Sequence, residues 1–398
     1  MILKPANKLR GSKIKRNRDV QSQVPSLYIH IPFCKKKCNY CDFVSYAGKE
    51  YLIDEYVEAL IRELHALTPL PEGEGVKTIY FGGGTPTLLE PHHLEHILNV
   101  AATFRLPSHH GGLKTAATLE ISIEANPATA NKAKLKELRQ LGINRLSIGV
   151  QSFNNKHLQV LGRIHNSKDI FRIYEDAKAA GFDNINLDLI FALPNQTLEE
   201  WQEDLKTALS LSPEHLSTYN LIIEEGTPFA KMSNAQCPIS NDGKTILEEK
   251  ELAMYEYTIE TLRSAGYKHY EISNFAKPGR ECQHNLVYWR NENYLGLGAG
   301  AHSHINGKRW SNPNCLEKYL SLTPSFSPLT PHSSQQNQGE TIFMGLRLLD
   351  GIAKDHFQGF EKEVEELTKE GLLTTEKNNL KLTRKGLYLA NEVFLHFI

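Results

Sequence analysis

Six short apolar runs alternate with helical segments between about residue 26 and residue 275, and this repetition constrains the fold more than any other feature. The strand-like runs are Leu27–Ile31, Val76–Phe81, Leu119–Glu124, Arg145–Val150, Ile185–Ile190 and Leu216–Ile222. Apolar residues recur every three or four positions over Tyr51–Leu67, and Thr197 with Glu200 matches a capping box before another helix. Such repeats predict an α/β fold with a parallel sheet covered by helices. Six units are fewer than a closed eight-fold barrel needs, so we expect a partial (β/α)6 barrel or a doubly wound sheet.

Unusual residues gather where these runs end. The strands themselves read as continuous apolar runs, which is typical of strands with both faces buried. Three cysteines follow the first run and Gly82–Thr85 follows the second, while Glu124, Gln151 and Asp188 lie at the ends of the next three. The carboxyl ends of parallel strands meet at one edge of a sheet, where α/β proteins bind ligands. The sequence therefore predicts a ligand site on this edge.

The charge balance argues against a nucleic-acid-binding protein. The chain has 45 Lys or Arg and 46 Asp or Glu, a formal net charge of -1, so no general basic field exists. Residues 1–25 are basic, and we expect a disordered tail there, with an organellar targeting peptide as the alternative. No run reaches the roughly 18 apolar residues of a membrane span. Three of the six cysteines lie within eight residues, unlike a disulfide framework, so we expect a reducing, cytoplasmic compartment.

The C-terminal part predicts a separate small domain. Residues 323–339 are rich in Pro, Ser and Gln, which indicates a linker. Residues 340–398 then predict helices over Thr341–Leu349 and Phe360–Glu370, a β-hairpin around Lys377–Asn379 and a final helix. This order is typical of a winged-helix-like α+β domain. The segment holds eight Lys or Arg and ten Asp or Glu, so we do not expect it to bind DNA.

Cys34, Cys38 and Cys41 form the strongest chemical signal. They are separated by three and by two residues, which places three thiolates on one short loop, and thiolates select iron–sulfur clusters or zinc. A structural zinc site takes four ligands, and no fourth cysteine lies nearby in the sequence. A [4Fe–4S] cluster on three thiolates leaves one iron open for another ligand. We favour such a cluster, with a zinc site and incidental buried cysteines as the alternatives.

The run from Gly82 to Pro86 is the second motif. Three consecutive glycines let a ligand touch the backbone and expose N–H donors. The run lacks the lysine of a phosphate-binding P-loop and does not match GxGxxG. It is either a tight strand–helix turn or, beside the cysteine loop, a site for an amino-acid or nucleoside group.

Seven motifs in order over residues 27–305 resemble the oxygen-independent coproporphyrinogen oxidase-like family of radical SAM proteins. They are Tyr28–Phe33 with the three cysteines, 82–87 (GGGTPT), Ile123–Pro127, Gly149–Ser152, Asp188–Thr197, Gly226–Phe229 and Tyr270–Asn274. The resemblance implies a radical SAM barrel whose cysteines hold [4Fe–4S] and whose fourth iron binds S-adenosylmethionine (SAM). By motif position the SAM site would be lined by Tyr28, Tyr40, Gly83, Gly84, Thr85, Glu124, Gln151, Arg163 and Asp188. Without a ligand, Glu124 and Asp188 would be capping or core-edge acids and Arg163 a surface ion pair.

Two subfamilies share this core, and the sequence favours one. The coproporphyrinogen dehydrogenases typically have another cysteine two residues after the third, where this chain has Phe43, and a longer N-terminal arm. The HemW-type haem chaperones resemble this chain through Cys41-Asp-Phe and through an HNxxYW segment, proposed in that family to bind haem, formed by His284, Asn285, Tyr288 and Trp289. Imidazole is a common axial ligand of haem iron, and aromatic rings pack on porphyrins. The alternative for this segment is a packed aromatic pair behind a polar loop.

The resemblance implies a haem chaperone that delivers haem to apo-haemoproteins such as respiratory cytochromes. Residues 26–322 would form the radical SAM core with a haem-binding extension. A flavodoxin or ferredoxin would supply electrons, and peripheral membrane contact stays open. Two alternatives are the coproporphyrinogen dehydrogenase, which decarboxylates propionates in porphyrin biosynthesis, and a radical SAM enzyme acting on another small substrate.

Overall fold

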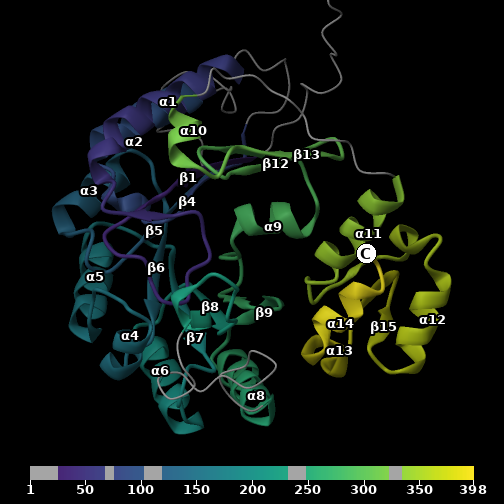
Figure 1. The fold of residues 1–398 in the computed structure, drawn as a ribbon. Coiled ribbons are helices and arrows are strands. Elements are labelled where there is room, and N and C mark those ends of the chain that lie inside the picture. The colour runs from purple at the N-terminus through teal and green to yellow at the C-terminus, as the bar shows by residue number, and fades with distance from the viewer. Residues whose placement is uncertain (1–25, 68–75, 103–118, 232–247, 322–333) are drawn as a thin grey trace, which may run out of the picture.

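The computed structural model describes residues 26–67, 76–102, 119–231, 248–321 and 334–398 (Figure 1). The predicted basic tail at 1–25 and residues 323–333 of the predicted linker lie outside the described residues. A large sheet with helices on its outer side forms most of the molecule, and the C-terminal segment forms a small body beside it (Figure 1).

The six predicted strands are all present. They are β1 (Ser26–Ile31), β4 (Thr78–Gly83), β5 (Glu120–Ala125), β6 (Arg145–Gln151), β7 (Ile185–Phe191) and β8 (His215–Asn220). Each pairs in parallel with the next. Three further strands, β9 (Lys268–Glu271), β10 (Asn274–Ala276) and β11 (Leu295–Leu297), complete the order β11-β1-β4-β5-β6-β7-β8-β10-β9. The sheet is therefore an open, partial barrel, and the α/β prediction is confirmed.

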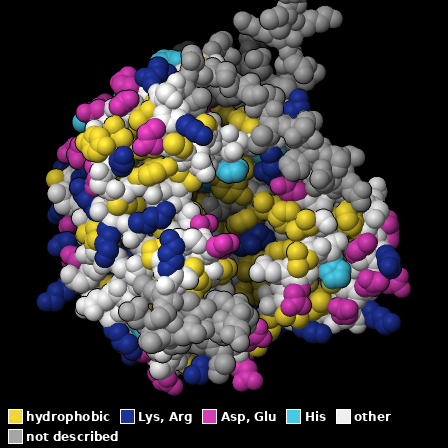
Figure 2. Space-filling model, viewed as in Figure 1, with side chains coloured by type: hydrophobic (Ala, Val, Ile, Leu, Met, Phe, Trp, Pro, Cys, Tyr) yellow, Lys and Arg dark blue, Asp and Glu magenta, His cyan; other side chains and the backbone are white. Residues whose placement is uncertain are grey.

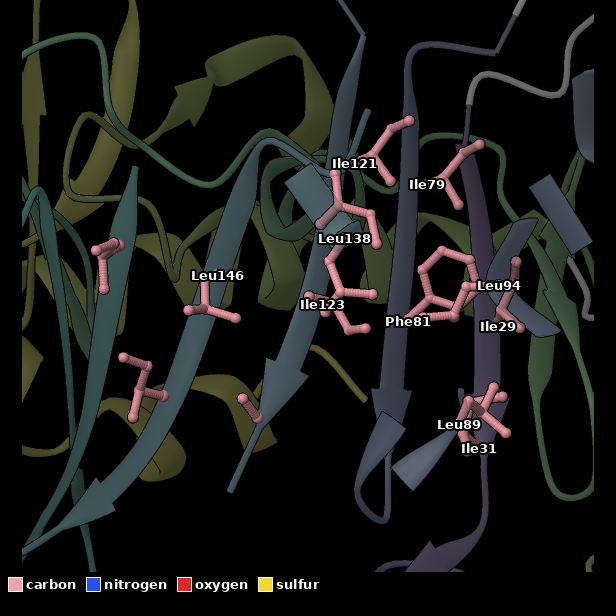
Figure 3. Close-up of a cluster of buried hydrophobic side chains, with 14 of the residues drawn as sticks. Ile29, Ile31, Ile79, Phe81, Leu89, Leu94, Ile121, Ile123, Leu138 and Leu146 are labelled. Carbon is pink, nitrogen blue, oxygen red and sulfur yellow. The ribbon is translucent and has the colours of Figure 1, made fainter. Parts of the chain in front are cut away.

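Helices cover the outer face of this sheet (Figure 1). They are α1 (Ile53–Leu67), α2 (Pro91–Ala101), α3 (Lys132–Gln140), α4 (Asn155–Val160), α5 (Ser167–Ala179), α6 (Leu198–Ser210) and α8 (Glu248–Ser264). Figure 3 shows how they are attached: Ile79, Phe81 and Ile123 of the strands pack with Leu94 of α2 and Leu138 of α3. The capping box predicted before α6 is present, with reciprocal bonds between Thr197 and Glu200.

The strands alternate between apolar and polar residues, so they are not the continuous apolar runs predicted, although most residues on both faces are buried as expected. Leu27, Ile29 and Ile31 of β1 are fully buried in the outer core, whereas Tyr28 lies between them and is only half-buried. Side chains on successive positions point to opposite faces of a strand. The inner face therefore carries a polar set, Ser26, Tyr28, His30, Thr78, Tyr80, Glu120, Ser122, Glu124, Arg145, Ser147, Asn186, Asp188, His215 and Ser217. The concave side of the partial barrel is polar and offers hydrogen bonds to a ligand.

A glycine-rich segment adds the edge strand that sequence periodicity missed. β11 pairs in parallel with β1, and the next residues form a hairpin of β12 (His302–Ile305) and β13 (Lys308–Ser311), followed by α10 (Leu316–Leu320). A Cβ atom at Gly296 would collide with the backbone of His302, so only glycine permits this contact. Glu63 of α1 fastens the segment from outside, accepting bonds from Gly298 N at 3.0 Å and the Tyr319 hydroxyl at 2.7 Å.

The C-terminal domain has its own hydrophobic core and a three-stranded sheet. Its elements are α11 (Ser334–Gly345), β14 (Ile352–Ala353), α12 (Glu361–Lys369), β15 (Leu373–Glu376), β16 (Asn379–Leu382), α13 (Arg384–Tyr388) and α14 (Ala390–Leu395). The predicted hairpin is β15–β16. The predicted linker is wrong at its end, because α11 begins at Ser334 and includes Gly339. Only glycine fits at this position of the helix, because a Cβ there would collide with the carbonyl oxygen of Phe397.

The two bodies meet through hydrogen bonds, an ion pair and apolar packing, for example of Ile272 against the C-terminal core. The backbone of β9 and the residues after it bonds the segment after α11, with Ile272 N to Arg347 O at 3.2 Å and Leu349 N to Tyr270 O at 3.1 Å. Arg347 also pairs with Glu271, whose side chain is fully buried, at 3.5 Å. Among the described residues, no helix is both long and apolar enough to cross a membrane.

Candidate functional site

The cysteine loop leaves the end of β1 and is fixed at several points. Cys34 ends β2 (Phe33–Cys34), which pairs with β3 (Tyr46–Ala47). Asn39, in the middle of the loop, bonds the end of α4 through its backbone N to Leu161 O at 3.0 Å and its side-chain amide to Val160 O at 2.8 Å. The loop is thus anchored on both sides of the three cysteines, which are free of disulfides.

Donors from two other segments of the chain point at the sulfur atoms. The Thr85 hydroxyl donates to Cys34 Sγ at 3.5 Å, and Arg163 Nη1 donates to Cys38 Sγ at 3.4 Å. Burial raises the pKa of Cys34 and of Cys41, so these thiols need a positive partner to ionise. Hydrogen bonds and positive charge of this kind stabilise thiolates and tune cluster potentials.

The donor set fits an iron–sulfur cluster. Among the described residues, no three His, Cys, Asp or Glu side chains stand close enough to hold one metal ion. A cubane has a different requirement, since each thiolate binds its own iron and the sulfurs stay apart. Three free cysteines on one anchored loop, with donors aimed at two sulfurs, fit that requirement.

The glycine run places backbone donors beside the cysteines. Gly84 N donates to Ile31 O at 2.8 Å, and a Cβ at Gly84 would lie 2.7 Å from the carbonyl oxygen of Phe33. Gly83 has a positive φ of 110° and donates its N–H to Glu124 Oε2 at 3.0 Å. Both glycines are therefore required by the backbone geometry, and they bring the run against the cysteine loop.

Two acids lie on the inner face close to this run. Glu124 also accepts from the Tyr80 hydroxyl at 2.9 Å, and Asp188 accepts from Ser147 at 2.9 Å and Asn186 at 2.8 Å. Burial, followed by the nearby carboxylate of Asp188, raises the pKa of Glu124 to about 7. Both side chains are only half-buried, so they line an accessible space rather than a sealed core.

Arg163 bonds both the end of β6 and the cysteine loop. Its Nη2 donates to Gly149 O at 2.8 Å, while its Nε is buried and lacks a partner within the described part of the chain. Gln151 lies at the same strand end with a positive φ of 66°, where the register between β6 and β7 shifts. A Cβ at Gly149 would lie 3.0 Å from the Gln151 amide and 3.2 Å from Arg163, so the two side chains converge there.

Two predicted tyrosines complete the set. Tyr28 donates or accepts a hydrogen bond with His30 at 3.0 Å and stacks on Tyr80 with ring centroids 6.2 Å apart. Burial raises the pKa of Tyr40, which also feels the charge of Arg163. The structure thus gathers all nine predicted SAM residues around one strand edge. Tyr80 is the residue that sequence reasoning missed, although the pattern Thr78-x-Tyr80-x-Gly82 marks an inward-facing polar series.

The HNxxYW segment forms α9 (Gln283–Trp289), which lies between the sheet and the C-terminal domain (Figure 1). Glu120, on the inner face of β5, accepts from Gln283 N at 3.2 Å and His284 N at 3.1 Å. A carboxylate at this end satisfies two helical N–H groups that would otherwise lack partners. The contact fixes α9 against the inner side of the barrel.

His284 is the most buried member of the segment. Its ring bonds Thr78 Oγ1 through Nδ1 at 2.8 Å and the Tyr288 hydroxyl through Nε2 at 2.9 Å. The ring also stacks on Tyr80, with centroids 5.0 Å apart. Burial lowers the pKa of His284 to about 3, so the imidazole is neutral at physiological pH. Tyr80 therefore touches both the predicted haem residue and, through its hydroxyl, Glu124.

The remaining members of the segment have different surroundings. Asn285 is half-buried on α9. Trp289 lies under the guanidinium of Arg347, 4.3 Å from the ring centroid, and its Nε1 is buried without a partner among the described residues. Of the two histidines in the glycine-rich segment, His302 is exposed and His304 is buried, and both lie on β12.

Comparison with known proteins agrees with this arrangement. A family model described as the radical SAM superfamily matches residues 28–208, and one described as the HemN C-terminal domain matches residues 339–389. The heme chaperone HemW of Bacillus subtilis (strain 168) is 38% identical over 388 residues, which cover 94% of this chain and 99% of that protein. This chain belongs to the HemW family.

A second HemW, from Escherichia coli (strain K12), is 42% identical over 281 residues, or 70% of each protein. Among solved structures, coproporphyrinogen III oxidase (HemN) from Escherichia coli, titled a radical SAM enzyme, matches with a TM-score of 0.78 at 26% identity. The match covers 95% of this chain and 91% of that one. The HemW family therefore shares its two-part architecture with HemN, as the sequence motifs predict.

Proposed function

We propose that this chain is a haem chaperone that binds haem and passes it to apo-haemoproteins such as respiratory cytochromes. The observation that carries the proposal is the similarity to HemW of Bacillus subtilis over 99% of that protein's length, because its name states haem chaperone activity. The geometry supports it, since α9 holds the HNxxYW residues on the same inner wall as the predicted SAM residues. Haem would be bound as cargo.

Cys34, Cys38 and Cys41 would hold a [4Fe–4S] cluster, and the nine residues of the strand edge would hold SAM. A bound cluster with an open iron supplies a site for the amino and carboxylate groups of SAM. Arg163, with its unpartnered Nε, suits a carboxylate, and Glu124 and Asp188 suit an amine or ribose hydroxyls. Arg163 would also screen the charge of Cys38.

Electron delivery would use the surface outside the cysteine loop. Lys35, Lys36 and Lys37 are exposed there, and Phe43 beside them is 66% exposed. Basic side chains around an exposed aromatic ring suit an acidic partner such as a flavodoxin or ferredoxin. We infer a cytoplasmic location for this chain and for its electron donor.

Coproporphyrinogen dehydrogenase activity is the second candidate, and the TM-score of 0.78 to HemN favours it. In that reaction SAM would be cleaved to abstract hydrogen from propionate side chains. The position where dehydrogenases typically have another cysteine is Phe43, an exposed phenylalanine that cannot bind iron. We therefore rank the enzyme below the chaperone.

One set of assays separates these functions. The protein, reconstituted anaerobically with iron and sulfide, is titrated with haem, mixed with an apo-cytochrome, and separately given coproporphyrinogen III with SAM and a reductant. The proposal predicts haem binding and transfer without protoporphyrinogen formation. The double variant His284→Ala/Tyr288→Phe should lose haem, whereas the control His302→Ala, which changes an exposed histidine on β12, should retain it. Turnover of coproporphyrinogen without haem transfer would replace the chaperone by the enzyme.

A further inference from the structure

A line of hydrogen bonds runs outward from the inner wall to α9. Thr78 Oγ1 donates to Ser26 Oγ at 2.7 Å, so its remaining capacity is to accept from His284 Nδ1 at 2.8 Å. The Nδ1 atom therefore carries the imidazole proton, and Nε2 presents a lone pair. Tyr288 donates its hydroxyl proton to that lone pair at 2.9 Å. The network thus fixes the tautomer in which His284 Nε2 accepts the hydrogen bond of Tyr288.

The three inner residues of this line are buried, and the fourth is less so. Ser26, Thr78 and His284 are 0%, 2% and 1% exposed, whereas Tyr288 is half-buried. Tyr288 is thus the outer end of the line. α9 lies between the sheet and the C-terminal domain, and Figure 2 shows a hollow on this face between the two bodies, bordered by hydrophobic side chains. A ligand that enters from solvent reaches Tyr288 before it reaches His284.

The two candidate ligand atoms, His284 Nε2 and the Tyr288 oxygen, also differ in the hydrogen bonds that iron ligation would break. Both nitrogens of His284 are engaged, and its ring is held against Tyr80, so direct ligation by Nε2 would require Tyr288 to leave. The Tyr288 oxygen keeps a free lone pair while it donates its proton. Its ring is already braced edge-on against Tyr294, with centroids 4.7 Å apart.

We propose that the Tyr288 oxygen is the axial ligand of bound ferric haem, with His284 as the positioning residue that orients its hydroxyl group. This proposal rests on the proposed haem-binding function and specifies the ligand within it. The O–H bond of Tyr288 breaks, its proton is released to solvent water at the half-buried end of the line, and an Fe–O bond forms while the iron stays ferric. No oxidant or reductant is required. Tyrosine oxygen serves as an axial haem ligand elsewhere in proteins.

The other residues of the segment do not compete for the iron. Trp289 has only an N–H donor, and its ring is covered by Arg347. Asn285 carries an amide, which is a weak ligand for haem iron. The choice is therefore between Tyr288 and His284, and the two make different spectroscopic predictions because only a phenolate gives iron–tyrosinate bands.

The test uses the full-length chain with ferric haem and three variants, Tyr288→Phe, His284→Gln and the control Tyr294→Phe. Absorbance titration gives haem affinity, and resonance Raman spectra report iron–phenolate vibrations; circular dichroism checks folding. We expect tyrosinate bands in the unchanged protein and in Tyr294→Phe. Tyr288→Phe should lose these bands and bind haem about tenfold more weakly or worse. His284→Gln should keep the bands at shifted frequency.

Each contrary result has a defined meaning. An unchanged protein that binds haem without tyrosinate bands overturns the ligand assignment even if every variant misfolds. Bands that persist in Tyr288→Phe, or a histidine-type spectrum that only His284→Gln abolishes, overturn it as well. Failure of the unchanged protein to bind haem at all overturns the proposed function together with this assignment.

Discussion

The cofactor edge, the sheet edge with the nine predicted SAM residues, lies beside α9 on the inner face of the sheet. The two regions differ in the contacts that a ligand would have to displace. At the edge, Arg163 Nε lacks a partner among the described residues, and the carboxylates of Glu124 and Asp188 are accessible. On α9, both nitrogens of His284 are bonded and Trp289 is covered by Arg347. The edge can receive a ligand with few rearrangements, whereas α9 has to exchange existing contacts.

The electrostatics differ in the same direction. The edge contains a guanidinium, two acids and three thiols, and the pKa of Glu124 is about 7. Around α9 the pKa of His284 is lowered to about 3, and its partners are hydroxyl groups. Ligand binding at the edge should therefore depend on pH near neutrality, while His284 itself contributes no such dependence there.

The largest expected effect tests whether the two regions are independent. Cys38→Ser should abolish the cluster, because two thiolates do not retain a cubane that needs three, and iron and labile sulfide should fall to background. Haem affinity should stay within about twofold, since α9 contacts none of the cysteine loop in the bonds described above. Iron and sulfide analysis and haem titration measure the two results.

The matched control is Cys315→Ser, which changes a partly exposed cysteine before α10. It should leave both cluster and haem binding unchanged. Loss of haem binding in Cys38→Ser alone would show that α9 depends on the cluster loop and that the two regions are not independent.

The second largest effect concerns Arg347, which lies over the ring of Trp289 on α9. Arg347→Met removes the partner of Glu271, a fully buried carboxylate, and should destabilise the chain by about 3 kcal/mol, because an unpaired buried charge remains. Denaturant unfolding measures this loss. The double variant Arg347→Met/Glu271→Gln should recover part of the stability, since no charge is then left unpaired; no recovery would mean that the charge pair is not the cause.

Much of this arrangement could be predicted because it depends on local signals and on parallel topology. The apolar runs gave strands in the right places, and the Thr197–Glu200 capping box formed as the sequence indicates. The nine predicted SAM residues lie together because parallel strands end at the same edge of the sheet. The structure supports the gathering of the nine predicted residues, while their role in SAM binding stays a prediction.

Other features depend on contacts between distant segments, and no local signal reveals them. β11 joins β1 across more than 260 residues, and its glycines fit the backbone of a later strand. The helix through Gly339 forms because it packs on Phe397, although its composition indicates a linker. The contact of Tyr80 with both Glu124 and His284 likewise needs three separate segments to be folded.

A third effect exploits the titration of Glu124. The carboxylate attracts the positively charged amino group of a ligand only when it is ionised, and its folded pKa of about 7 lies above the usual value. As pH falls from 8 to 6 the group becomes protonated, so SAM affinity should fall about tenfold. Equilibrium binding of SAM to the cluster-loaded protein measures the profile, and Glu124→Gln should bind weakly at both pH values.

Glu120→Gln is the control for that profile. Glu120 lies on the same face of β5 as Glu124 but bonds α9 instead of residues at the cofactor edge. It should keep the pH dependence of SAM binding. A flat profile in the unchanged protein would remove Glu124 from the role given to it.

The smallest expected effect comes from the residue that touches both regions. Tyr80→Phe removes the hydroxyl that donates to Glu124 and keeps the ring that stacks on His284. One lost hydrogen bond of about 1 kcal/mol corresponds to roughly fivefold weaker SAM binding. Because that bond stabilises the carboxylate, its loss should also raise the pKa of Glu124 and move the midpoint of the SAM profile to higher pH. Haem affinity should not change if the regions are independent. A haem affinity that responds to SAM in the unchanged protein, but not in Tyr80→Phe, would instead show that this one side chain couples the cofactor edge to α9.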